Sequence, residues 1–114
     1  MGISGANNTN FTVYPAQGSS LANWHTTFNT TLTGTYTTQR FKRNNNASVY
    51  FQELGGFQSG NTNQITSATC NNPPNSISTL GMPVHMNLWL FQGHAPANNA
   101  PVEIIVHNFT FTHL

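Results

Sequence analysis

The chain has 114 residues, a formal net charge of +1 and only 4% charged residues, against roughly a quarter in ordinary soluble domains. Three basic residues, two glutamates and no aspartate are too few to neutralise a nucleic-acid backbone or to build a carboxylate cage for Ca²⁺ or Mg²⁺. Because 17 Asn and 16 Thr supply the polarity, the expected partner is a neutral, hydroxyl-rich ligand such as carbohydrate, or another copy of this chain.

The first part of the chain alternates apolar and polar residues with a period of two, which is typical of strands. Residues 11–14 (FTVY) predict a short strand that Pro15 stops. At most one helical turn is expected, near residues 20–23, and Trp24 follows it in a loop-like segment. The N-terminal part therefore predicts β-structure with irregular connections.

A hairpin is predicted in the middle of the chain. Residues 35–41 are polar and β-branched, and residues 48–54 form a second alternating run that ends at two glycines. The asparagine run 44–46 between them is a turn by composition. We therefore expect a hairpin that brings Arg40 and Phe51 onto neighbouring strands.

Residues 58–78 consist mainly of Asn, Ser, Thr, Gly and Pro, with Ile65 and little else to bury. This composition predicts a long loop that holds no more than one edge strand. Pro73 and Pro74 exclude regular structure at their own positions.

Two strong strands are predicted in the last third of the chain. Residues 84–91 alternate, so that one face is apolar, and residues 102–111 are apolar on both faces, as in a strand covered on both sides. Residues 93–101 predict an ordered hairpin loop between them. The fold class expected for residues 1–114 is an all-β antiparallel sandwich or jelly roll, as one domain or half of one.

Four segments near the end of the chain form one series: MNLWLFQG at 86–93, APANN at 95–99, VEIIV at 102–106 and FTF at 109–111. Together they resemble the C-terminal strands of the glycoside hydrolase family 16 jelly roll, a concanavalin A-like fold. Residues 10–15, 34–41 and 48–52 resemble earlier strands of the same family, so the resemblance spans roughly residues 8–112.

The catalytic pattern of that family is absent from this chain. The family's hydrolases carry Glu-x-Asp-x-Glu on one strand, because retention requires two carboxylates about 5–5.5 Å apart across the scissile bond. Glu53 and Glu103 are 50 residues apart, and there is no aspartate. The resemblance would place the missing strand before Met1, so we expect no catalytic residue. We also expect exposed sheet edges that another chain or another copy completes.

Carbohydrate-binding residues are predicted from side-chain chemistry and from the resemblance, which puts strand 84–91 at or near a sugar-binding face. An aromatic ring stacks on the C–H face of a pyranose, while Asn, Gln and His bond its hydroxyls. A structural role is the alternative for each: core filling or capping for the tryptophans, cross-strand packing for the others. The predicted residues are Trp24, Tyr50, Gln52, His85, Asn87 and Trp89.

Other kinds of site have little support. The five histidines lack zinc-ligand spacing, so no metal or cofactor is expected, and each glutamate is expected to be solvated or paired with a basic residue. Cys70 is the one cysteine, either an inert small residue or half of a bridge to another chain. No apolar run is long enough for a membrane helix, and residues 1–5 do not form a signal peptide.

Three functions remain open. The first is a non-catalytic, carbohydrate-associated β-sandwich segment that binds neutral polysaccharide or oligosaccharide. The second is a self-assembling structural protein of a filament or layer, since so few charges leave little repulsion between copies. The third is an inactive fragment of a family 16 hydrolase. All three favour an extracellular or cell-surface location. Five Asn-x-Ser/Thr sequences signify glycosylation only in a chain secreted by a eukaryote.

Overall fold

The computed structural model describes residues 8–15, 18–44, 47–71, 77–78, 80–81, 83–88 and 91–113. The chain forms two units, Met1–Met82 and Pro83–Leu114. The described residues contain five strands in two antiparallel sheets and one short 3₁₀ turn. The predicted all-β class is therefore confirmed, as a partial β-sandwich that is not closed into a barrel.

The smaller sheet pairs β1 (Thr9–Val13) with β2 (Trp24–Phe28), with Phe11 opposite Thr26. β1 matches the strand predicted at residues 11–14, shifted by one or two residues. β2 was not predicted. Residues 20–23, where at most one helical turn was expected, are irregular, and a strand rather than a loop begins at Trp24. The residues of β2 do suit a strand, because Trp24 and Phe28 are aromatic and the two threonines between them are β-branched.

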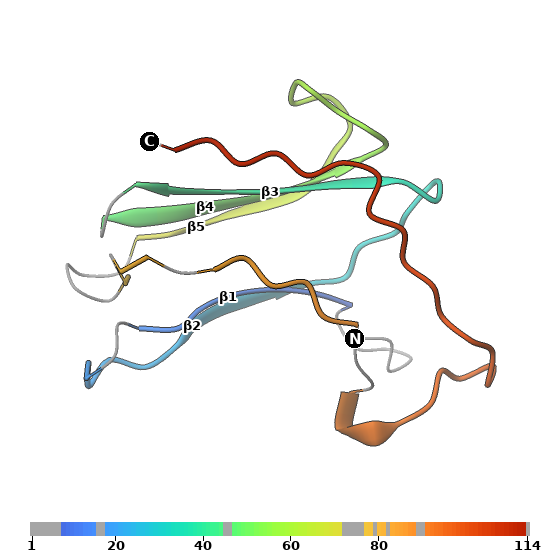
Figure 1. Cartoon of the computed structure of the whole chain (residues 1–114), viewed down its shortest axis with the longest axis horizontal. Helices are drawn as coiled ribbons and strands as arrows, with labels where there is room; N and C mark the ends of the chain where they lie inside the picture. The colour runs from blue at the N-terminus through green and yellow to red at the C-terminus, as the bar shows by residue number, and fades with distance from the viewer. Residues whose placement is uncertain are drawn as a thin grey trace. The chain divides into compact units, whose positions relative to one another are not determined.

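The larger sheet has the order β3-β4-β5, with β3 at Thr37–Asn44, β4 at Ser48–Gly55 and β5 at Gln64–Cys70. The predicted hairpin is confirmed, since Phe41 of β3 lies opposite Phe51 of β4. β5 is the edge strand allowed within residues 58–78. Figure 1 draws these three strands as one layer and the β1-β2 pair as another.

Two predicted irregular positions fall on residues that the structure does not describe. Asn45 and Asn46, in the predicted turn, lie outside the described residues, although the amide of Ala47 donates to the Asn44 carbonyl at 2.9 Å, as a tight connection requires. Pro73 and Pro74 also lie outside the described residues.

Aromatic rings fill the space between the two sheets. Phe51 stacks on Phe11 of β1, with ring centroids 5.1 Å apart, and on Trp24 of β2 at 6.2 Å. Beside them a buried cluster joins Val49 to Ile77 and to Cys70, which is fully buried. A thiol in that position reaches another chain only if the fold opens.

One carboxylate is buried in the same layer. Glu53 is 5% exposed, and its oxygens accept hydrogen bonds from Gln39 Nε2 of the neighbouring strand β3 at 2.8 Å and from Thr9 Oγ1 of the smaller sheet at 3.4 Å. The expectation of a solvated Glu53 is therefore wrong, because the alternation of β4 carries its side chain to the same face as Phe51. Glu103 is exposed, as expected.

The second unit contains no strand among its described residues (Figure 1). The strands predicted at residues 84–91 and 102–111 are therefore wrong for the described positions. A strand is defined by its hydrogen-bonded neighbour, and these segments form no bridge with any described part of the chain. The 3₁₀ turn Phe91–Gly93 stands where the first strand was expected to end.

A turn does occupy the predicted loop at residues 93–101. The amide of Asn99 donates to the carbonyl of Pro96 at 2.8 Å, and the amide of Ala100 donates to Asn98 Oδ1 at 3.1 Å. These residues therefore form a turn through their own hydrogen bonds, although the strands expected on either side are absent among the described residues. No helix among the described residues has the length and apolarity to cross a membrane.

Candidate functional site

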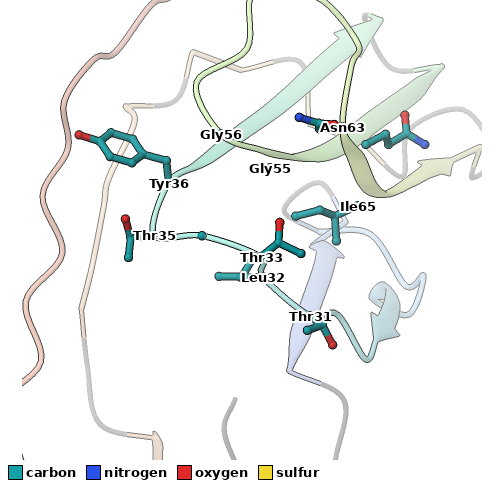
Figure 2. A pocket seen from close by; sticks show the side chains of 11 residues that line it. Thr31, Leu32, Thr33, Thr35, Tyr36, Gly55, Gly56, Asn63 and Ile65 are labelled. Atoms are coloured by element: carbon teal, nitrogen blue, oxygen red, sulfur yellow. The ribbon is translucent and has the colours of Figure 1, made fainter.

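A hollow of about 590 Å³ lies at one end of the larger sheet, where β4 ends and β3 and β5 begin. Figure 2 shows the connection from β2 to β3 along one side, the end of β4 along the other, and Ile65 projecting between them. The described lining residues carry no formal charge: Thr31, Leu32, Thr33, Gly34, Thr35, Tyr36, Gly55, Gly56, Asn63, Gln64 and Ile65.

Backbone hydrogen bonds hold the sides of the hollow together. The amide of Gly55 donates to the carbonyl of Asn63 at 2.8 Å, and the amide of Gly56 donates to the carbonyl of Tyr36 at 2.9 Å. Gly56 has φ +82° and Asn63 has φ 55°, two left-handed positions that suit glycine and asparagine. Three separate segments thus meet at this end of the sheet.

The lining offers hydrogen-bonding groups of both kinds and a small apolar surface. Hydroxyls come from three threonines and Tyr36, an amide from Asn63, and apolar surface from Leu32 and Ile65. The amide of Gln64 also lines the hollow but is already bonded to Gln52 and Ser67. The Tyr36 ring is half exposed and projects outward from the rim of the hollow (Figure 2). A site of this size accommodates a small molecule, and its uncharged donors and acceptors match a neutral polyol. The described lining has no carboxylate for acid–base catalysis.

The sequence-predicted residues of β4 lie elsewhere. Tyr50 and Gln52 share one face of the strand, as predicted, but Gln52 is only 3% exposed. Its amide nitrogen donates to Gln64 Oε1 at 2.8 Å, and its amide oxygen accepts from Arg40 Nη1 at 3.4 Å. Both ends of that amide are therefore occupied within the sheet, whereas Tyr50 keeps an intermediate exposure.

The remaining predicted residues belong to other segments of the chain. Trp24 opens β2 and is half-buried against Phe51, so its ring packs on the core side. His85 and Asn87 are exposed in the second unit. Trp89 lies outside the described residues. A role for any of them in sugar binding stays a prediction.

The sequence contains the residues that line the hollow, but their composition does not show that they lie together. Threonine recurs at 31, 33 and 35 around Gly34, and two glycines end β4. Such a run reads as an ordinary polar connection. Only the strand register, which pairs Thr37 with Gly55 and Leu54 with Gln64, shows that three distant segments share one end of the sheet.

The described residues hold no group of three His, Cys, Asp or Glu side chains placed to bind a metal ion. Comparison with protein-family models, with curated protein sequences and with solved structures finds no match for this chain. The resemblance to glycoside hydrolase family 16 therefore stays a prediction, and the assignment of function depends on the hollow and on the exposed surfaces.

Proposed function

We propose that this chain is a non-catalytic module that binds neutral polysaccharide or oligosaccharide at the hollow beside Tyr36. One observation carries the proposal: the described lining combines hydroxyls, amides and a half-exposed aromatic ring with no formal charge. The chain's low charge supports the same reading, because a neutral ligand gains nothing from electrostatic steering.

The chemistry of the lining fits sugar recognition in two ways. Neutral hydroxyl and amide groups exchange hydrogen bonds with sugar hydroxyls without the desolvation cost of a buried charge. The Tyr36 ring is half exposed at the rim, and its exposed apolar surface is of the kind that packs against the C–H face of a sugar unit. Contacts of this kind favour a chain of sugar units that extends past the rim.

Binding to a panel of insoluble neutral polysaccharides, followed by calorimetry with soluble oligosaccharides, tests the proposal. Tyr36→Ala is expected to weaken binding by about three- to tenfold, the range of one aromatic contact. Tyr14→Ala is the matched control, because Tyr14 is 71% exposed and does not line the hollow. Retention on no polysaccharide, or equal binding by both variants, would contradict the proposal.

A separate variant tests the site predicted from the sequence. If Trp89→Ala abolishes retention while Tyr36→Ala does not, the sugar-binding surface belongs to the second unit rather than to the hollow.

The proposed extracellular location and the alternative of an inactive family 16 fragment depend on the sequence encoded before Met1. An in-frame Glu-x-Asp-x-Glu there would make this chain part of a hydrolase.

Self-assembly into an extracellular structure is the second candidate function. It is favoured by the apolar residues that the second unit exposes: Val84, Met86, Leu88, Val102, Ile104, Ile105, Val106, Phe109 and Phe111. Apolar surface on this scale, with one formal charge among residues 83–113, favours association. Sedimentation velocity tests this candidate, and a monodisperse monomer at all concentrations would contradict it.

A further inference from the structure

Residues 102–106 (VEIIV) have the composition of a strand but lie in no strand of the described structure. Val102, Ile104, Ile105 and Val106 are each 54–65% exposed. β-Branched residues favour the extended conformation and pack well on a pleated surface. A segment of this kind is stabilised when a sheet edge supplies the missing neighbour.

β3 is an edge of the larger sheet and carries all three basic residues of the chain, Arg40, Lys42 and Arg43. The hydrogen bonds of the two arginines go to neutral oxygens, including the carbonyl of Gly60 at 2.7 Å and that of Ser78 at 2.8 Å. Lys42 is exposed. Arg40 and Lys42 lie on one face of the strand and Arg43 on the other, so the exposed positive charge at this edge is that of Lys42.

The same edge also exposes an aromatic ring. Phe41 is 64% exposed, although its neighbour across the hairpin, Phe51, is packed in the core. An aromatic ring beside a β-branched residue is a favourable cross-strand pair. An added strand rich in Ile and Val would therefore cover Phe41.

Charge complementarity selects β3 among the strands of the two sheets. Glu103 is the one formally charged residue in 83–113, and the chain's other carboxylate, Glu53, is buried. β1, β2 and β5 contain no Lys, Arg, Asp or Glu. Glu103 therefore meets an opposite charge on an edge strand only at β3.

We propose that residues 102–106 of one copy of this chain add as a strand to the β3 edge of a second copy. Main-chain hydrogen bonds hold the added strand, Glu103 lies beside Lys42 on one face of the sheet, and Ile104, on the opposite face of the added strand, covers Phe41. This inference rests on the self-assembly candidate and is independent of polysaccharide binding. It names the two surfaces that meet.

Two proline variants test the pairing by sedimentation equilibrium. Ile104 and Ile105 are 65% and 63% exposed, so either substitution to proline removes a similar apolar side chain. Neighbouring amides of a strand point to opposite sides, so only one of the two faces β3. One of Ile104→Pro and Ile105→Pro is therefore expected to weaken association by at least about tenfold, and the other by less than about threefold. Equal effects would overturn strand pairing, and a monomeric wild type would overturn self-assembly as well.

A charge exchange tests β3 as the acceptor. Glu103→Lys and Lys42→Glu are each expected to weaken self-association by about two- to fivefold, as for an exposed ion pair. A mixture of the two variants restores the opposite charges in both directions and is expected to associate as tightly as wild type. If the mixture associates no better than each variant alone, β3 is not the acceptor, while self-assembly through another edge stands.

Discussion

The two units of this chain use similar residues in different ways. In the first unit, every strand has a neighbour, and Phe11, Phe51 and Leu54 are buried or packed against other rings. In the second unit, Ile104 and Phe111 are at least as favourable for strands, yet they are 65% and 70% exposed and lie in no strand. The difference shows that strand propensity forms a sheet only where another segment supplies hydrogen bonds and a surface to cover.

The contrast also separates two kinds of function. The hollow is built by the paired unit, because register brings its three walls together. The exposed residues 102–106 belong to the other unit and offer a surface that requires a partner. The proposed ligand binding uses the hollow, whereas the proposed association joins residues 102–106 to the β3 edge, so the two proposals are separable by mutation.

Hydrogen exchange should show the largest difference between the units. Amides in β4, which is bonded on both sides, are expected to exchange at least about a thousandfold more slowly than those of residues 102–106 in a dilute solution of the chain. The measurement is exchange followed by mass spectrometry at two protein concentrations. Equal protection of both segments at the lower concentration would contradict the comparison, whereas protection of 102–106 that grows with concentration would support strand addition.

Removal of an aromatic ring should have unequal effects on stability in the two units. Phe51→Ala is expected to lower the free energy of unfolding by about 3 kcal/mol, because Phe51 stacks on two rings from the other sheet. Phe111→Ala, at a ring that is 70% exposed, is expected to change it by less than about 0.5 kcal/mol. Urea denaturation in dilute solution measures both, and similar losses would show that the second unit is packed in the folded state.

The two glutamates provide the next comparison. Glu53→Ala removes the acceptor of Gln39 Nε2 and Thr9 Oγ1 and leaves a cavity where a buried side chain stood, and it is expected to cost about 2 kcal/mol. Glu53→Gln retains an acceptor and the side-chain shape, and is expected to cost about half as much. Glu103→Ala, at an exposed carboxylate, is the control and should be nearly neutral in the monomer. A neutral Glu53→Ala would mean that the carboxylate is not enclosed between the sheets.

Two glycines with left-handed backbone give the smallest expected effect. Gly56 has φ +82°, and a Cβ there would lie 3.3 Å from Gln58 Nε2, whereas Gly93 has φ +76° with no neighbour within 4 Å. Gly56→Ala is expected to lower stability by about 1 kcal/mol. Gly93→Ala carries the same local strain, but it should leave the unfolding midpoint of the first unit unchanged. Thermal unfolding of both variants measures this, and a matching loss in Gly93→Ala would show that the two units unfold together.

Local patterns predicted the parts of the fold that depend on neighbours in the sequence. The hairpin of β3 and β4 was found because alternation on both sides of an asparagine run leaves one simple register. The edge strand within 58–78 was anticipated, although its bounds were not. β2 was missed because Trp24, its first residue, was interpreted as part of a loop-like segment. The strands expected after residue 83 were wrong for the described residues. Alternation shows that a segment suits a strand, but it does not show which segment pairs with it.

The sequence by itself determined, through its alternation, composition and glutamate spacing, that this chain is a β-protein with almost no charge and without the Glu-x-Asp-x-Glu pattern. Those properties are local and additive, so a sequence states them directly. Tertiary structure alone decided that Glu53 is buried, that Gln52 is occupied within the sheet and that segments 31–36, 55–56 and 63–65 enclose one hollow. The physical reason is register: hydrogen bonds between strands decide which distant residues become neighbours, and a shift of one residue would turn every side chain to the other face.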